Sequence, residues 1–286
     1  MRQIQGELCN FTASDKILLT GFLYNPSHSK KAMIYLHGMG SSMIGGPIWA
    51  ACAAAKKARW AVLTFNNRGT GLVMGFKKQN GKYLTAGTAC ERFEDCILDI
   101  EGAIRYLKKR DFKKIILIGH STGCQKAVFY SSKKINRTVR GLVLLAPCDD
   151  LNISKKEAGS MHPWIMRYCK FKIWCGQGNT PIWNEKVKFF SPRRILGAWS
   201  DHGIEANLFN YKKPILVIRR IRIPILSVLG KDEQYAVIPP ATMLELLRKE
   251  YKNKKSSTAL VPGAHNFKGG EKELTQVIAN WLKKIK

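Results

Sequence analysis

A serine stands between two glycines in the string IILIGHSTGCQ, at the end of an apolar run. The pattern Gly119-x-Ser121-x-Gly123 is typical of a nucleophile held on a sharp turn from a buried strand to a helix. Small flanking residues are required because such a turn brings neighbouring backbone close to the serine. The string alone should occur by chance in about one in ten such chains. Its position between a predicted strand and a predicted helix is therefore what indicates a nucleophile.

A serine hydroxyl becomes an effective nucleophile when a base accepts its proton and an acid orients that base. Asp232 follows a predicted strand in GKDEQY, and His265 follows the next strand in VPGAHNF. Both positions lie at carboxyl ends of strands, the edge of an open α/β sheet where active sites assemble. The predicted triad is therefore Ser121, Asp232 and His265. Three other acids compete with Asp232 for the third place: Glu233, Asp149 and Asp150.

Acyl transfer also requires donors for the oxyanion that develops on the attacked carbonyl. The glycine-rich turn LHGMG follows a buried strand, and we expect one backbone N–H from Met39 and a second from Thr122. His37 and His120 are predicted to be structural, bonded to local backbone. Arg68, in FNNRGTG, is predicted to hold the loop beneath the site by binding backbone carbonyls, although it could instead meet an anionic group of a substrate.

The elements that must position these residues alternate along the chain. Apolar runs rich in branched residues predict buried strands at 17–24, 32–38, 60–66, 114–120, 141–147, 223–230 and 257–263. Helical composition or periodicity follows at 47–58, 92–110, 122–134, 240–253 and 271–285. This alternation predicts an open, mostly parallel sheet with helices on both faces.

Residues 150–215 interrupt the alternation, so the chain is expected to divide into a core (1–149 and 216–286) and an insertion. The insertion holds four of the seven tryptophans and no evident strand of the sheet. It could be a small satellite core, or a lid whose aromatic inner face shapes an acyl pocket. In the lid interpretation, Trp164 and Trp183 contact the substrate.

Charge and composition restrict the function classes. The formal charge is +28 over 286 residues, but basic pairs occur along the whole chain, at the edges of predicted elements. No zinc-finger, helix-turn-helix or RNP pattern accompanies them, so no specific nucleic-acid partner is expected. Without a secretory signal or a membrane span, the sequence predicts a cytoplasmic protein with reduced cysteines. The spacing of His162, Cys169 and Cys175 matches no common zinc site, and neither a metal nor a cofactor is expected.

Five motifs in their usual order resemble the α/β-hydrolase superfamily over nearly the whole chain: LHGMG, FNNRGTG, GHSTG, GKDEQY and PGAHNF. Within it, HGMGSS, FNNRG, FEDCILDIEGAI and APCDD are similar to the DUF1749 or siderophore-esterase-like branch of small serine hydrolases. The resemblance implies a mostly parallel eight-stranded sheet, an acyl-enzyme mechanism and no metal.

The sequence thus predicts a serine hydrolase acting on carboxylic esters with small or medium acyl groups. An aminopeptidase-like or acyl-transferring enzyme could use the same triad. A different class of function, a non-catalytic binder of nucleic acid or anionic surfaces, would use the positive charge. The intact triad argues against this alternative, because a binder has no need of it.

Overall fold

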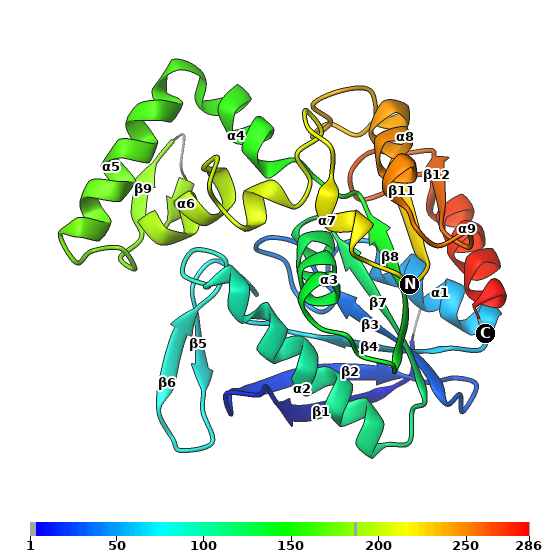
Figure 1. Cartoon of the computed structure of the whole chain (residues 1–286). Helices are drawn as coiled ribbons and strands as arrows, with labels where there is room; N and C mark the ends of the chain where they lie inside the picture. The colour runs from blue at the N-terminus through cyan, green and yellow to red at the C-terminus, as the bar shows by residue number, and fades with distance from the viewer. Residues whose placement is uncertain (1–3, 186–187, 286) are drawn as a thin grey trace.

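The computed structural model describes residues 4–185 and 188–285, and its centre is an eight-stranded sheet with the order β1-β2-β4-β3-β7-β8-β11-β12 (Figure 1). The strands are β1 (Glu7–Thr12), β2 (Leu18–Tyr24), β3 (Lys31–Leu36), β4 (Ala61–Phe65), β7 (Lys114–His120), β8 (Val139–Leu145), β11 (Ile225–Gly230) and β12 (Ser257–Val261). The strands from β4 to β12 pair in parallel, whereas β2 runs antiparallel to both of its neighbours. The predicted mostly parallel sheet is confirmed.

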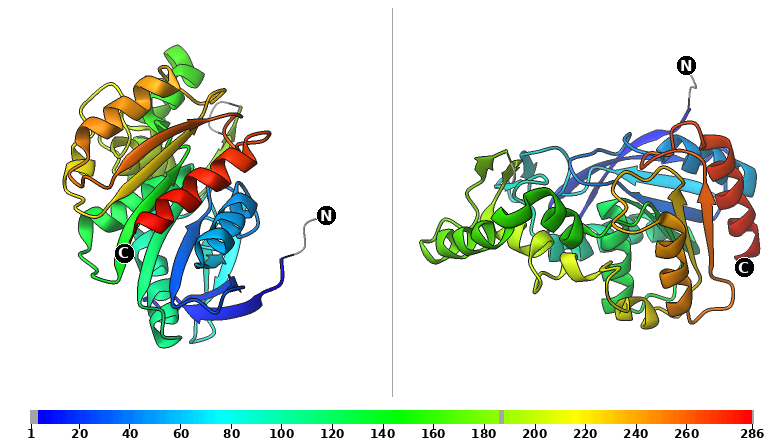
Figure 2. Two further views of the ribbon diagram at one scale, coloured as in Figure 1. Left: turned by 90° about the vertical axis from the view of Figure 1, so that its right-hand side faces the viewer. Right: turned by 90° about the horizontal axis from the view of Figure 1, so that it is seen from above.

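Helices cover both faces of this sheet (Figures 1 and 2). On one face α1 (Ile48–Ala58) packs against α9 (Glu271–Lys284); on the other lie α2 (Cys96–Lys109), α3 (Thr122–Lys133) and α8 (Pro240–Glu250). The central strands are accordingly buried along their length, as in β4, where all five residues are buried. This double coverage explains why the central strands read as continuous apolar runs. The edge strand β1 was not predicted, because its exposed and buried residues are mixed within six positions and form no continuous apolar run.

The insertion lies together on one side of the molecule, far from α9 (Figures 1 and 2). It contains α4 (Asp150–Ala158), η2 (Gly159–Met161), α5 (His162–Trp174), β9 (Ile182–Asn184), β10 (Lys188–Phe190) and α6 (Pro192–Trp199). The two short strands pair with each other and not with the central sheet. After η3 (Glu205–Asn207) and α7 (Leu216–Arg219) the chain returns to β11.

A second hairpin, β5 (Met74–Lys77) and β6 (Tyr83–Ala86), and the short helix η1 (Phe93–Asp95) lie between β4 and α2. The hairpin was not predicted, whereas η1 lies within the predicted helical segment 92–110. Both hairpin strands are four residues long and mostly exposed, so they lack the apolar run that indicates a buried strand.

Candidate active site

Ser121 occupies the turn between β7 and α3, in a backbone conformation with φ 54° and ψ −126°. A non-glycine residue in this region is strained, and the surrounding structure must hold it there. A Cβ at Gly119 would lie 2.2 Å from the Gly123 carbonyl oxygen, and one at Gly123 would lie 2.0 Å from the Leu36 carbonyl oxygen. In the adjoining turn, a Cβ at Gly38 would lie 2.9 Å from Ser121 Cβ. Glycine is thus required on both sides of the serine, as the sequence predicted for its flanks.

His265 follows β12, and its ring contacts a carboxylate. Its Nδ1 lies 2.9 Å and 3.0 Å from the two carboxylate oxygens of Glu233. Glu233 is 7% exposed and also accepts a hydrogen bond from the Tyr235 backbone N–H. The prediction that Asp232 is the partner of His265 is therefore wrong. Glu233, one of the competing acids, occupies that position.

The reason lies in the turn after β11. The Asp232 backbone N–H donates to the Gly263 carbonyl at 3.1 Å, and the Asp232 side chain is exposed. The next residue, Glu233, then points inward, and its longer side chain reaches the imidazole. Asp149 is also removed from consideration, because its carboxylate accepts from the backbone N–H groups of Asn152 and Tyr211 and caps α4.

The main chain of His265 is held by neighbouring side chains. Its N–H donates to Gln234 Oε1 at 3.0 Å, and its carbonyl accepts from His120 Nε2 at 3.0 Å. Burial lowers the pKa of His120 to about 3, so this histidine is a neutral donor. The ring of Tyr235 meets the His265 ring edge-on, with centroids 4.8 Å apart. His120 is structural, as predicted, but its role is to fix the backbone of the candidate base.

His37 is also bonded locally, as predicted. Its Nδ1 lies 2.9 Å from the Gly38 carbonyl oxygen, and its Nε2 lies 2.8 Å from Thr70 Oγ1. Burial lowers the pKa of His37 to about 4, which keeps the ring neutral. The turn that carries Met39 is therefore anchored by a buried uncharged histidine.

The predicted oxyanion donors lie on either side of Ser121. Met39 follows β3 in the glycine-rich turn, and Thr122 begins α3; both line the same cavity as Ser121. Within the described residues, neither backbone N–H donates to another protein group. N–H groups without a protein partner, as at the first turn of a helix, can donate hydrogen bonds to a bound anion.

This cavity, about 580 Å³ in volume, contains the hydroxyl and the imidazole together. Cys148, which follows β8, lies between them: its Sγ is 4.0 Å from Ser121 Oγ and 3.9 Å from His265 Nδ1. Among the described residues, Ser121 Oγ makes no direct hydrogen bond to the His265 ring. Catalytic hydrogen bonds are often long before substrate binds. The sequence held no signal for Cys148, because thiols of this kind are usually simple core residues.

The insertion lines the cavity, but not through the predicted tryptophans. Trp164 is 63% exposed and Trp183 is 73% exposed, and neither borders the cavity. Trp164 instead lies against the Arg167 guanidinium on the surface of α5. The insertion residues that do line the cavity are Asp150, Ile153, Ser154, Glu157, Phe190 and Trp199. The prediction for Trp164 and Trp183 is therefore wrong, since spacing in sequence does not reveal which side of α5, or of the β9 strand that carries Trp183, is turned to solvent.

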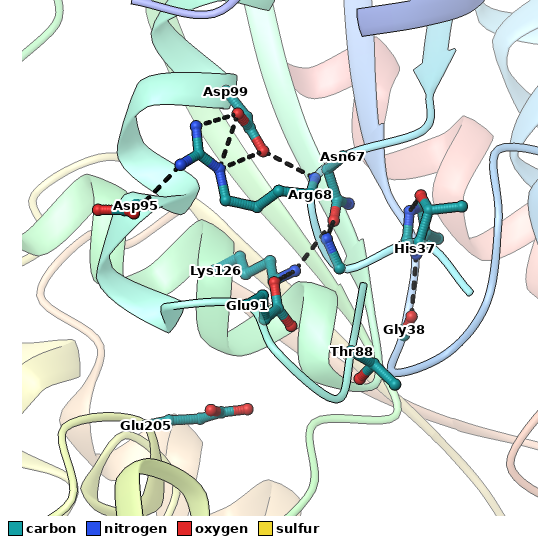
Figure 3. A network of polar contacts seen from close by, with 12 residues as sticks. His37, Gly38, Asn67, Arg68, Thr88, Glu91, Asp95, Asp99, Lys126 and Glu205 are labelled. Atoms are coloured by element: carbon teal, nitrogen blue, oxygen red, sulfur yellow. Dashed lines mark hydrogen bonds and ion pairs between the residues drawn. The ribbon is translucent and has the colours of Figure 1, made fainter. Parts of the chain in front are cut away.

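Arg68 is buried beneath the site and paired with carboxylates (Figure 3). Its guanidinium lies 2.7 Å from Asp99 on α2, and 3.2 Å from both Asp15 and Asp95. Burial alone would lower the pKa of Arg68, but the three carboxylates outweigh it and raise the pKa. Arg68 is thus paired within the protein and its role is structural, as predicted, but its partners are carboxylates and not the expected backbone carbonyls.

A second buried charge cluster joins the core to the insertion, and the sequence did not indicate it. Lys126 on α3 lies 2.7 Å from Glu91, which lies 3.7 Å from Arg194 on α6. Arg194 also pairs with Glu205 and donates to the Thr88 carbonyl at 3.2 Å. Figure 3 shows Glu91, Lys126 and Thr88 close to the turn that carries Gly38. The insertion is thus attached beside the candidate site by the Arg194–Glu91 ion pair and by the hydrogen bond from Arg194 to the Thr88 carbonyl.

The described residues contain neither a metal-binding cluster nor a membrane-spanning helix. No group of three or more His, Cys, Asp or Glu side chains is arranged to hold a metal ion. No helix in the described ranges combines the length and the apolar character that crossing a membrane requires.

Comparisons with known proteins identify the family and the fold of the chain. The model of the family described as "Protein of unknown function (DUF1749)" matches residues 2–191. No curated protein matches the chain. Similar solved structures are the siderophore hydrolase EstB of Aspergillus fumigatus (15% identity, 99% of this chain and 97% of that chain, TM-score 0.70) and the esterase Pf2001 of Pyrococcus furiosus (18%, 99% and 92%, 0.64). Est1E of Butyrivibrio proteoclasticus with ferulic acid bound is also similar (17%, 96% and 98%, 0.66). At these identities the likeness establishes the α/β-hydrolase fold.

Proposed function

The chain belongs to the DUF1749 family, and we propose that this member is a serine hydrolase cleaving carboxylic esters of small or medium acyl groups. One observation carries the proposal. The His265 imidazole binds both oxygens of the Glu233 carboxylate and lines one cavity with Ser121, which is held in a strained turn. Such a base-acid pair beside an exposed hydroxyl is the arrangement that nucleophilic catalysis requires.

In the proposed mechanism, Ser121 Oγ attacks the ester carbonyl while His265 accepts the hydroxyl proton. Glu233 at Nδ1 leaves Nε2 as the ring nitrogen for this transfer, and its negative charge stabilises the imidazolium. The backbone N–H groups of Met39 and Thr122 would bind the oxyanion. His265 then protonates the departing alcohol, leaving an acyl group on Ser121. Water, deprotonated by the same histidine, releases the acid and restores the serine.

The insertion is proposed to act as a lid. Its α4 face, together with Phe190 and Trp199, forms part of the cavity wall. The cavity volume of about 580 Å³ is in the range of small-molecule sites. A wall contributed by the insertion would therefore limit the length of the acyl or alcohol part that fits.

A fluorophosphonate probe and a panel of p-nitrophenyl esters test the proposal. The wild type should be labelled at Ser121, as located by peptide mass spectrometry, and should hydrolyse short esters. Labelling should disappear in Ser121→Ala. A folded wild type that reacts with neither the probe nor any ester of the panel would contradict the proposal.

A further inference from the structure

The candidate cavity has a charge opposite to that of the whole chain. The chain has 48 Lys and Arg residues against 20 Asp and Glu residues. Yet the charged side chains that line the cavity are Asp150 and Glu157, and no lysine or arginine of the described ranges lines it. A basic protein would by default surround a pocket with cations, so this reversal indicates a property of the ligand.

Both acids lie on one face of α4. Asp150, Ile153, Ser154 and Glu157 all line the cavity, and their spacing of three, one and three residues places them along one stripe of a helix. Seven residues of helix separate the two carboxylates by about 10 Å. The stripe thus presents one partly buried acid beside Gln125, and a second, exposed acid further along the helix.

Asp150 has no cation of its own. Gln125 Nε2 donates to its Oδ2 at 2.8 Å, and in the described chain no lysine or arginine lies within ion-pair distance of it. The nearby Arg194 is instead bound to Glu205 and Glu91. Burial, reinforced by Glu205 and Asp149 and opposed by Arg194, raises the pKa of Asp150 well above its ordinary value. A cation beside this carboxyl would favour its ionised form.

The remaining polar and aromatic lining fits a cation as well. Phe190, Trp199 and Tyr235 contribute aromatic side chains to the cavity. Aromatic faces together with carboxylates are the usual surroundings of a bound ammonium group. Thr88 also lines the cavity, and although it is only 2% exposed, its hydroxyl has no hydrogen-bond partner among the described residues. An unpartnered buried hydroxyl is costly unless a ligand satisfies it.

We propose that the preferred substrate is an ester carrying an ammonium group, which Asp150 binds and which Glu157 attracts at the cavity. The proposal rests on the proposed ester hydrolysis at Ser121. The positive charge of the whole chain would attract anionic esters. It would therefore favour anionic over cationic substrates, the opposite of the preference proposed here.

Isosteric ester pairs test it, with the cation placed in either half of the ester. In the acyl half, p-nitrophenyl 4-(trimethylammonio)butanoate is compared with p-nitrophenyl 5,5-dimethylhexanoate. In the alcohol half, 2-(trimethylammonio)ethyl butanoate is compared with 3,3-dimethylbutyl butanoate, with acid release followed in a pH-stat. Mono-p-nitrophenyl glutarate supplies an anionic ester. Each kcat/KM is divided by the hydroxide-catalysed rate of the same ester, which removes differences in intrinsic reactivity.

In at least one pair, the cationic ester should exceed its neutral isostere by about tenfold or more, because the trimethylammonium group, which has no N–H to donate, is attracted by the Asp150 carboxylate and by aromatic faces. Asp150→Asn should reduce this cation-to-neutral ratio on the order of tenfold, because it removes the carboxylate charge. The exposed Glu157→Gln should reduce it about threefold, an effect that weakens in salt. Glu245→Gln removes an exposed acid of α8 outside the cavity, and it should leave the ratio unchanged.

Asparagine at position 150 can still accept the hydrogen bond from Gln125, so the variant should fold, and probe labelling of Ser121 verifies an intact site. Ratios near one in both pairs, a preference for the anionic ester, or an unchanged ratio in Asp150→Asn would overturn the proposal. If no ester of either charge is hydrolysed, the proposed hydrolase function fails instead.

Discussion

The core and the insertion contribute to the same cavity in different ways. In the core, Ser121, Glu233 and His265 each stand just after a strand of one sheet, β7, β11 and β12. Their mutual positions follow from hydrogen bonding between neighbouring strands. The insertion reaches the cavity through α4, β10 and α6, which pair with no strand of that sheet. The proposed reacting groups are thus placed by strands of the central sheet, whereas part of the cavity wall comes from elements outside that sheet.

The two regions also differ in how they are held together. The core buries a large, continuous set of apolar side chains, whereas a separate and smaller apolar cluster joins the insertion to the core, where Cys169, Phe190 and Ile195 are buried with Ala89. The insertion is also attached through Arg194, which pairs with Glu91 of the core. Regions with few buried apolar contacts open locally at lower free energy than the core. Mutations in the core should therefore change the rate of hydrolysis on all esters, whereas mutations in the insertion should change the preference among esters or the local stability.

The largest expected effect comes from removing the reacting groups of the core. Ser121→Ala and His265→Ala should each lower kcat/KM on every ester by about 10⁴-fold or more, because these groups act as a unit. Steady-state assays with p-nitrophenyl esters measure the loss, and thermal unfolding monitors the fold. A residual activity above a tenth of wild type in either variant would separate that residue from the chemistry.

The acid beside His265 should give the next largest effect. Glu233→Gln should lower kcat about a thousandfold, because the imidazole loses the carboxylate that orients it and stabilises its charged form. Asp232→Asn is the matched control one residue away, and its exposed side chain should leave kcat within about twofold of wild type. The opposite ranking of these two variants would restore Asp232 as the acid.

Breaking the attachment of the insertion should cost stability before it costs chemistry. Arg194→Met leaves Glu205 and Glu91 buried without this cation, and removal of one partner of a buried pair costs about 3 kcal/mol. The exposed pair of Lys155 and Asp201 provides a control, because Lys155→Met should change stability by less than about 1 kcal/mol.

Hydrogen exchange should locate this loss in the insertion, with amides of α4 to α6 exchanging faster while those of β7 and β8 remain protected. Uniformly faster exchange throughout the sheet would show that the insertion and the core unfold as one unit.

The smallest expected effect is a difference in acyl-length preference between variants of two tryptophans of the insertion. Trp199 lines the cavity and meets Phe190 edge-on with centroids 5.6 Å apart, so Trp199→Ala should change the preference between long and short acyl esters by about tenfold. Trp164→Ala should leave that preference within about twofold, because its side chain is exposed outside the cavity. Relative kcat/KM over an acyl series from acetate to decanoate measures both. Equal changes in the two variants would indicate a general loss of stability rather than a wall of the pocket.

The central sheet was predictable because its signals are local. Strands buried on both faces must be apolar throughout, so the seven predicted runs correspond to seven of the eight strands. The turn at Ser121 was equally readable, since its glycines are demanded by backbone within a few residues and by the adjoining turn at Gly38. The structural role of Arg68 was predictable in kind, but its three carboxylate partners come from distant parts of the chain.

By itself the sequence determined which strands are buried, where the serine turn lies, and which histidine follows the last strand, because each depends on neighbours in the chain. Only the tertiary structure decided between Asp232 and Glu233, whose side chains point in opposite directions from one turn. It also decided which aromatic residues of the insertion line the cavity, and that Asp150 and Glu157 line a cavity without lysine or arginine. These outcomes depend on how a turn and a helix are oriented by residues far along the chain, and composition and spacing contain no record of that orientation.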